Sequence, residues 1–337
     1  MYSSTLSNLA LVFYVLTRQL YLSIHWHRVL YSSCVKDLNS FRSNTYSQMG
    51  EDGLIFEILR RLPLPKNIDR WCCEFGAWDG LFLSNTARLI KEENYHAVLI
   101  EPDKKRLKDL QVNFPQESVV KIASFVTPQG TRSIDVILSK TPIPSDFDFL
   151  SIDIDGMDYY ILQSLKKFRP KLICIEFNPT IPNSVYFVQD ENSKIKQGSS
   201  AKAIWDLAIS KEYTVIAATD FNLFLLDDKY LELFLADLKP IESLIPNGND
   251  PQIIFSGYDG TLLSNKPNIS LGWHGEFPLS RSQILPRYLR KYSGDYNLVQ
   301  RKFFKVFFWL KRERLIDIIN SEKKLSKMKK RIRGLFL

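Results

Sequence analysis

Carboxylates gather in one stretch of the sequence, Asp148 to Tyr160 (DFLSIDIDGMDYY). Side chains alternate along a strand, so Asp153 and Asp155 are expected on one side and the intervening apolar residues on the other. Two carboxylates that project together can serve as a base or orient a hydroxyl group. The alternative is that Asp155 or Asp158 caps the following helix, a position that aspartate favours, whereas Asp153 lies too early for capping.

A second polar group follows the next apolar run, at Glu176 and Asn178 in ICIEFNPTIP. Polar side chains at the exit of a strand are costly to bury without partners, which favours a site over a core position. Open α/β sheets bind ligands at the carboxyl ends of their strands, so these side chains should approach Asp153 and Asp155. The group could position a substrate hydroxyl or hold a hard divalent cation such as magnesium.

Glutamate and glycine residues mark the ends of two earlier strands. In CCEFGAWDG, Gly76 and Gly80 permit a tight turn and a close backbone approach to a ligand, and Glu74 can take an ammonium group. Glu101 ends HAVLIEPD, where a carboxylate can accept both hydroxyls of an adenosine ribose. Glycines in such turns also serve purely structural purposes, so this loop alone does not define a site.

The elements that must position these residues extend from about residue 70 to 228, where short apolar runs alternate with amphipathic stretches. Seven strands are expected, at 71–75, 97–101, 119–123, 147–153, 172–177, 214–218 and 223–226. Helices are expected at 83–92, 104–114, 132–139, 158–168 and 200–211, with a turn and a further helix over 47–62. Few residues separate the last two strands, which predicts a hairpin between them. The predicted fold class is α/β: a Rossmann-like, seven-stranded, mostly parallel sheet with a final antiparallel strand and helices on both faces.

Several strings of the sequence resemble one protein family: SQMGEDG, CCEFGAWDG with LSNT, VLIEPD, FDFLSIDIDGMDYYILQSL, FRPKLICIEFNPTIP and GSSAKAIWDLA. In this order they resemble FkbM-type methyltransferases, a branch of the class I S-adenosylmethionine-dependent superfamily. The resemblance is greatest to an uncharacterised subgroup that also carries YDGTLL and LGWHG, and it spans Ser47 to Arg290. It implies a Rossmann-like core, S-adenosylmethionine as methyl donor, and transfer to oxygen, commonly of a sugar or polyketide hydroxyl.

The resemblance also implies roles for individual residues. It places the cofactor loop on Glu74, Gly76 and Gly80, and the ribose carboxylate on Glu101. It places the family's aspartate motif on Asp153, Asp155 and Gly156, although the family often has glutamate where this chain has Asp155. An alcohol needs a base or a metal to become nucleophilic, so Asp153, Asp155 and His274 of LGWHG are the candidate catalytic residues. A single histidine in such a turn is also commonly structural.

The expected activity is therefore that of an S-adenosylmethionine-dependent O-methyltransferase acting on a hydroxyl of a glycan or glycoconjugate. An alternative from another class is a non-catalytic, membrane-associated binding or scaffold protein that retains the fold. A third, an NAD-binding enzyme, is disfavoured by the missing GxGxxG and by the antiparallel terminal pair.

Four segments are expected: an N-terminal amphipathic helical extension (1–45), the Rossmann-like domain (46–240), a C-terminal extension packed on it (241–298), and a basic amphipathic tail (299–337). The first segment has apolar residues at helical spacing, but its apolar run is too short to cross a bilayer and does not resemble a secretory signal. The turn-forming NGND at 247–250 is the expected boundary region of the extension.

The formal net charge of +8 is concentrated at one end of the chain. From Arg301 onward, thirteen Lys and Arg stand against three acidic residues, and the remainder is slightly acidic, so nucleic acid is not an expected partner. Phenylalanines interleave with these charges, which predicts a helix on the anionic inner face of a membrane. The alternative is that the aromatic half packs on the domain. Four cysteines without paired metal spacing indicate reduced thiols and a cytoplasmic protein.

Overall fold

The computed structural model describes residues 37–65, 68–154, 156–193, 196–245, 252–270 and 276–310 of the chain. The chain divides into two compact units, Met1–Asn249 and Asp250–Leu337, referred to below as the first and second units. The predicted N-terminal extension up to residue 36 and the tail beyond residue 310 lie outside the described residues. No helix among the described residues is long and apolar enough to span a membrane.

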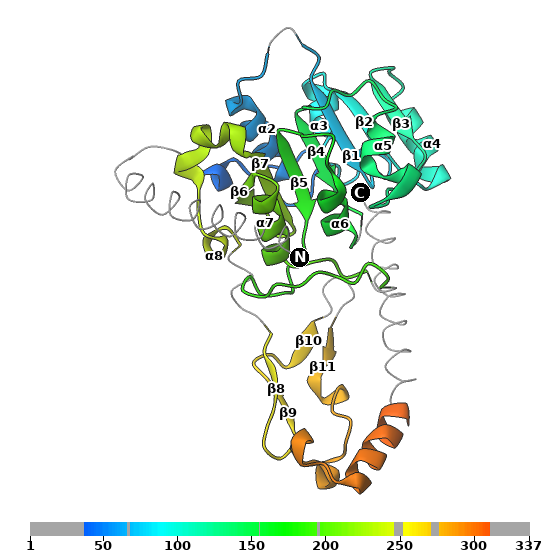
Figure 1. Cartoon of the computed structure of the whole chain (residues 1–337), viewed down its shortest axis with the longest axis vertical. Coiled ribbons are helices and arrows are strands. Elements are labelled where there is room, and N and C mark those ends of the chain that lie inside the picture. Colours follow the sequence, from blue (N-terminus) through cyan, green and yellow to red (C-terminus); the bar gives the residue numbers. More distant parts are fainter. Residues whose placement is uncertain are drawn as a thin grey trace, which may run out of the picture. The chain divides into compact units, whose positions relative to one another are not determined.

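The first unit is built on a seven-stranded sheet with the order β3-β2-β1-β4-β5-β7-β6 (Figure 1). The strands are β1 (Trp71–Phe75), β2 (His96–Ile100), β3 (Val119–Ile122), β4 (Phe149–Ile152), β5 (Leu172–Glu176), β6 (Tyr213–Ala218) and β7 (Asn222–Asp227). All pairs are parallel except those of β7, which runs antiparallel to both β5 and β6. The predicted fold is confirmed, and the strand order reverses between β1 and β4, the kind of position where open α/β sheets bind ligands.

Helices cover both faces of this sheet (Figure 1). The α-helices of the unit are α2 (Glu51–Arg61), α3 (Ala87–Glu92), α4 (Lys104–Asn113), α5 (Ile134–Leu138), α6 (Asp158–Ser164), α7 (Ala201–Ser210) and α8 (Ile241–Leu244). Its 3-10 helices are η1 (Leu38–Phe41), η2 (Gly130–Arg132) and η3 (Asp228–Asp237). The first three α-helices pack on one face, and α5, α6 and α7 pack on the other.

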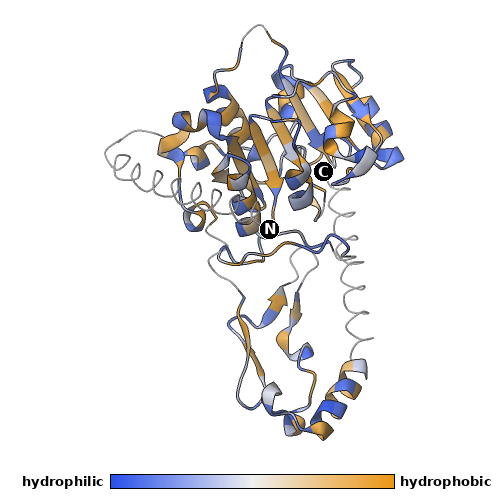
Figure 2. Cartoon of the chain, viewed as in Figure 1, coloured by the Kyte–Doolittle hydropathy of each residue, from blue (hydrophilic) through white to orange (hydrophobic). Residues whose placement is uncertain are grey.

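The alternation of side chains along the strands creates two hydrophobic cores, one on each face (Figure 2). On β1, for example, Cys72 packs with the α2 side and Cys73 with the α6 side. These cysteines and Cys174 are buried free thiols, and burial raises the pKa of each well above its usual value. Buried thiols of this kind are inert packing groups.

Two helices are shorter than the sequence pattern predicts. The helix expected from Leu83 begins only at Ala87, because Leu83 has a positive φ of 58° that no α-helix permits. The helix expected to reach Phe168 ends at Ser164, because the backbone N–H groups of Lys166 and Lys167 donate instead to the Asp135 carboxylate at 3.0 and 3.1 Å. At the second place, a side chain distant in sequence thus supplies hydrogen bonds that compete with the helix.

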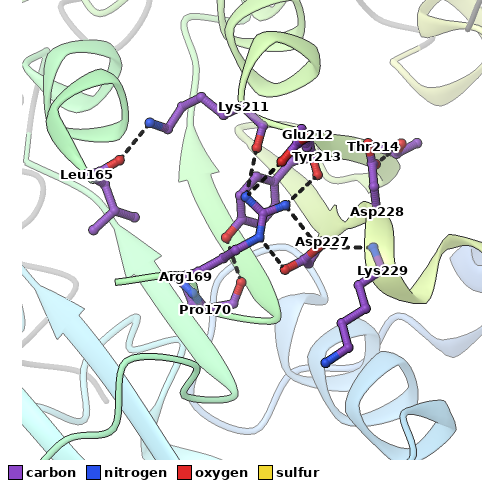
Figure 3. A network of polar contacts seen from close by, with 10 residues as sticks. All are labelled: Leu165, Arg169, Pro170, Lys211, Glu212, Tyr213, Thr214, Asp227, Asp228 and Lys229. Atoms are coloured by element: carbon purple, nitrogen blue, oxygen red, sulfur yellow. Dashed lines mark hydrogen bonds and ion pairs between the residues drawn. The ribbon is translucent and has the colours of Figure 1, made fainter. Parts of the chain in front are cut away.

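The edge of the sheet where β5 and β6 begin is closed by a charged network around Arg169 (Figure 3). The guanidinium forms a bidentate pair with the buried Asp227, at 2.7 and 3.0 Å. It also donates to the carbonyl groups of Lys211 and Glu212 and lies 4.9 Å over the Tyr213 ring. Arg169 is thus paired with the buried Asp227 at this edge.

The second unit consists of two small hairpins and short helices. The hairpins pair β8 (Ile254–Ser256) with β9 (Leu262–Ser264) and β10 (Asn268–Ser270) with β11 (Glu276–Pro278). YDGTLL therefore forms the turn and return strand of the first hairpin, whereas LGWHG falls in residues 271–275, outside the described residues. Three 3-10 turns follow, η6 (Leu279–Arg281), η7 (Arg287–Leu289) and η8 (Ser293–Asp295), and residues 298–310 form a helix.

Candidate active site

The loop after β1 folds back over the end of β2. The N–H groups of Gly76 and Ala77 donate to the Ile100 carbonyl at 3.1 and 3.3 Å, and the N–H of Trp78 donates to Glu101 at 2.9 Å. Gly76, Trp78 and Gly80 all have positive φ values, of 72°, 52° and 76°. A non-glycine residue in this conformation carries strain that the surroundings must compensate, and such strain is frequent at ligand sites.

Glu101 lies directly beyond the end of β2 and is only 4% exposed. One carboxylate oxygen accepts the N–H of Trp78 and the other accepts the N–H of Asp103 at 2.7 Å. A carboxylate offers about four lone-pair sites, so each oxygen keeps capacity for one further donor. Two acceptor positions are the number that the two hydroxyls of a ribose need, and the ribose role of Glu101 stays a prediction.

The two glycines of this loop contact the protein itself. A Cβ atom at Gly76 would overlap the backbone carbonyl of Asp153 at the end of β4. A Cβ at Gly80 would lie 2.5 to 2.6 Å from side-chain atoms of Phe114 and Leu110. The backbone at these glycines was predicted to approach a ligand closely, and in the structure it also approaches other segments of the chain. At Gly76, the β1 loop contacts Asp153.

Glu74 is fully buried and is held by the LSNT segment. Its carboxylate accepts hydrogen bonds from the Ser84 hydroxyl (2.7 Å), the Asn85 N–H (2.8 Å) and the Thr86 hydroxyl (2.6 Å). Burial raises the pKa of Glu74, and these three hydrogen bonds oppose that rise. The role of Glu74 toward an ammonium group stays a prediction, while its contacts position the 84–86 segment.

Asn85 extends this buried network across the sheet. Its side-chain amide donates to the Ser151 hydroxyl on β4 at 3.0 Å and lies 3.8 Å from the Cys174 sulfur on β5. One loop thereby ties together three adjacent strands close to their carboxyl ends. Sequence reasoning did not select Asn85, although its place in the LSNT string was a signal.

The aspartate motif follows β4. Asp153 is the first residue after the strand and is exposed, Asp155 lies outside the described residues, and Gly156 is buried with φ 108°. The carboxylate of Asp158 accepts the N–H groups of Ile154 and Gly156 at 3.0 and 2.9 Å. Asp158 therefore holds the backbone of the preceding loop in place through its carboxylate. Its predicted alternative role as a helix cap was wrong, since Met157 is the N-cap residue of α6.

Burial and then the negative charge of Asp153 raise the pKa of Asp158 to about 7 from its ordinary 3.8. A folded-state pKa above the unfolded one means that the stabilisation from Asp158 is complete below about pH 4 and is lost as the pH rises through about 7. We expect the unfolding free energy of the wild type to fall relative to that of Asp158→Asn between pH 5 and pH 8 in urea titrations, because only the wild type must ionise a buried carboxyl. A wild type that gains stability relative to the variant over this range would contradict the assignment.

The segment from Asn178 to Ser199 is anchored over the aspartate motif. The Asn178 amide donates to the Gln197 carbonyl at 2.6 Å, and its oxygen accepts from the N–H and hydroxyl of Thr180. The buried Gln189 accepts the N–H groups of Gln197 and Gly198, and its side chain lies against Gly156. Asn178 thus holds this loop, and Gln189, which sequence reasoning missed, orients it toward the end of β4.

The SQMGEDG motif reaches the same edge of the sheet. Glu51 accepts hydrogen bonds from Thr219 at 2.7 Å and Asn222 at 3.2 Å, and Asn222 pairs in register with Glu176 at the end of β5. Burial, and after it the charges of Glu51 and Asp153 among other carboxylates, raise the pKa of Cys174. Glu51 and Glu176 therefore meet Asn222 at this edge, and the convergence of Asp153, Asp155, Glu176 and Asn178 in one site stays a prediction.

The described residues give no support to the predicted magnesium ion, because no three His, Cys, Asp or Glu among them are placed to hold a metal. Asp155, a predicted ligand, and His274, the third predicted catalytic residue, both lie outside those residues. The structure brings Gly76, Trp78 and Glu101 together beside Asp153. Glu176 lies two strands from β1 on the same edge.

The order and directions of the strands define a Rossmann-like fold of the class I methyltransferase type. Residues 116–197 match the model of the methyltransferase FkbM domain family, which confirms the resemblance predicted from the sequence over β3, β4, β5 and the anchored loop. A search of curated proteins finds no match.

Similar solved structures are methyltransferases of different kinds. TrmK of M. capricolum with S-adenosyl-homocysteine has 14% identity over 52% of this chain and 67% of its own, with a TM-score of 0.31. Precorrin-6y C5,15-methyltransferase of Geobacter metallireducens GS-15 has 13% identity over 58% and 100%, with a TM-score of 0.33. CalS10 of Micromonospora echinaspora, an amino pentose methyltransferase, has 10% identity over 55% and 99%, with a TM-score of 0.33. These values assign neither a substrate nor a residue to this chain.

Proposed function

We propose that this protein is an S-adenosylmethionine-dependent O-methyltransferase that acts on a hydroxyl of a glycan or glycoconjugate. The observation that carries the proposal is the junction of the β1 loop with Glu101 on one side and Asp153 on the other. Trp78 donates its N–H to Glu101, and Gly76 packs against the Asp153 backbone. A cofactor site beside Glu101 and an acceptor site beside Asp153 would thereby be adjacent.

In this proposal, Glu101 holds the ribose of the cofactor through the free capacity of its two oxygens. S-adenosylmethionine supplies an electrophilic methyl group when it is bound. Asp153 is exposed at the end of β4, so it can accept the proton of an incoming hydroxyl and orient that oxygen. Glu74 and Asn85 keep the loop and the strand ends in place, and the loop anchored by Gln189 contributes to the acceptor side.

The carbohydrate nature of the acceptor rests on the family resemblance and on the predicted convergence of carboxylates. Carboxylates are acceptor-only hydrogen-bonding groups when ionised, and hydroxyl-rich molecules supply many donors. Attachment of the chain to an anionic membrane is likewise a proposal, which concerns the second unit alone.

Isothermal titration of the full-length protein with S-adenosylhomocysteine tests the cofactor assignment. We expect saturable binding, and we expect Glu101→Gln to weaken it about tenfold, because one charge-assisted oxygen is lost. The matched control is Glu117→Gln, an exposed glutamate ahead of β3, which should bind normally.

Binding by Glu101→Gln with unchanged affinity would refute the ribose role of Glu101. Failure of the well-folded wild type to bind S-adenosylhomocysteine would refute the cofactor assignment and favour the scaffold alternative. Thermal unfolding of each variant separates these outcomes from a simple loss of folded protein.

A further inference from the structure

The helix over residues 298–310 exposes apolar side chains along one side. Four of them, 42 to 59% exposed, are spaced by four, three and four residues and are called the apolar stripe: Val299, Phe303, Val306 and Leu310. Residues at this spacing lie above one another on a helix, so the stripe is continuous. Large apolar side chains in a continuous exposed row indicate an interaction surface.

The other phenylalanines of the helix are turned elsewhere. The rings of Phe304 and Phe308 stack with centroids 6.4 Å apart, and Phe304 contacts Tyr296 at 6.1 Å. Phe304 is half-buried, whereas Phe308 is 50% exposed on a different side of the helix from the stripe.

Cations flank the stripe. Lys302 and Lys305 are exposed and follow each other at helical spacing, and Trp309, which is 66% exposed, lies on the same line. Residues 298–310 contain Arg301 as a third cation and no acidic residue. In Figure 2 this helix carries both strongly hydrophilic and strongly hydrophobic residues.

We propose that the apolar stripe is a membrane-contact face, lying in the headgroup region of an anionic bilayer with Lys302 and Lys305 at the lipid phosphates. Apolar side chains on one side, lysines beside them, and a tryptophan at the boundary are the features of helices that lie in a membrane interface. The charge is complementary, because Lys302 and Lys305 lie beside the stripe and residues 298–310 contain no acid. This surface is independent of methyl transfer.

A second copy of the chain is the competing occupant, since spacings of four and three residues also occur in coiled coils. A coiled-coil seam needs three to four apolar heptads. The next positions at this spacing are Glu313, Asp317 and Asn320, which are all polar. Self-association through the stripe would also bring like charges together, so the lipid surface is favoured.

Vesicle flotation of the full-length protein tests the proposal. The vesicles contain either phosphatidylcholine alone or two parts of phosphatidylcholine to one part of phosphatidylglycerol. We expect binding to the anionic vesicles, and the double variant Phe303→Ser with Leu310→Ser should bind about tenfold more weakly or worse. Val112→Ser is the matched control, because Val112 is a 78% exposed apolar residue of α4 in the first unit.

Two further variants separate the stripe from general electrostatic attraction. Lys302→Glu with Lys305→Glu should also weaken binding about tenfold, and more salt should weaken binding of the wild type. Quenching of tryptophan fluorescence by bromine-labelled acyl chains should be seen in the wild type and largely lost in Trp309→Phe, whose other tryptophans remain.

Three results would overturn the proposal. Equal binding of the wild type and the Phe303/Leu310 variant would mean that charge alone attracts the chain to lipid. A wild type that is dimeric in solution, with a monomeric Phe303/Leu310 variant, would assign the stripe to a second copy. A wild type that does not bind the anionic vesicles would refute the membrane contact. If the Phe303/Leu310 variant then also loses thermal stability, the stripe is assigned to packing within the chain.

Discussion

Replacing Asp153 with asparagine is expected to lower methyl transfer about 100-fold or more while cofactor binding is retained. Asp153 is the exposed residue that directly follows β4, and its backbone carbonyl meets Gly76 of the β1 loop. Asparagine keeps the size of the side chain but cannot take a proton from a hydroxyl. A panel of hydroxyl-bearing glycans is first screened for one that supports methyl transfer. Turnover with that glycan is then measured as the release of S-adenosylhomocysteine.

The Asp153→Asn variant has a second readout that needs no acceptor. The charge of Asp153 helps to raise the pKa of Asp158, so its removal should lower the pKa of Asp158, which is measurable by carboxyl NMR. The matched control is Asp146→Asn, an exposed aspartate ahead of β4, which should leave turnover unchanged. Nearly normal turnover by Asp153→Asn would eliminate Asp153 as the base.

Replacing Gly76 with alanine is expected to lower the free energy of unfolding by about 3 kcal/mol, from left-handed strain and from overpacking against the Asp153 carbonyl. The neighbouring group is backbone at the end of a strand, so it cannot move aside as a flexible side chain could. The sequence predicted that Gly76 permits a close backbone approach to a ligand, and the contact with Asp153 predicts that folding is affected as well.

Gly130→Ala separates the two causes in urea unfolding experiments. Gly130 has a similar φ of 81°, but a Cβ there meets no atom within 4 Å, so only about 1 kcal/mol of conformational strain is expected. Equal losses for the two alanine variants would contradict the proposed clash at Gly76. S-adenosylhomocysteine titration of folded Gly76→Ala then measures any separate effect on the cofactor site.

Sequence patterns determined the sheet and its edge. The apolar runs that end at Phe75, Ile100 and Ile152 were recognisable because burial requires local hydrophobic periodicity, which a single sequence displays. Glu101 and Asp153 were predicted as the last residues of their strands, and each lies one residue beyond the strand. The hairpin of β6 and β7 followed from the short connection between them.

Only the tertiary structure decided the partners of these residues. The positive φ at Leu83, the bonds from Glu74 to the 84–86 segment, and the contact of Gly76 with Asp153 depend on segments that meet in space. Glu51 and Thr219 are 168 residues apart and still form a hydrogen bond. A sequence pattern reports how often a residue type recurs locally, whereas the choice of hydrogen-bond partner depends on which chain segments the packed sheet brings within about 3 Å.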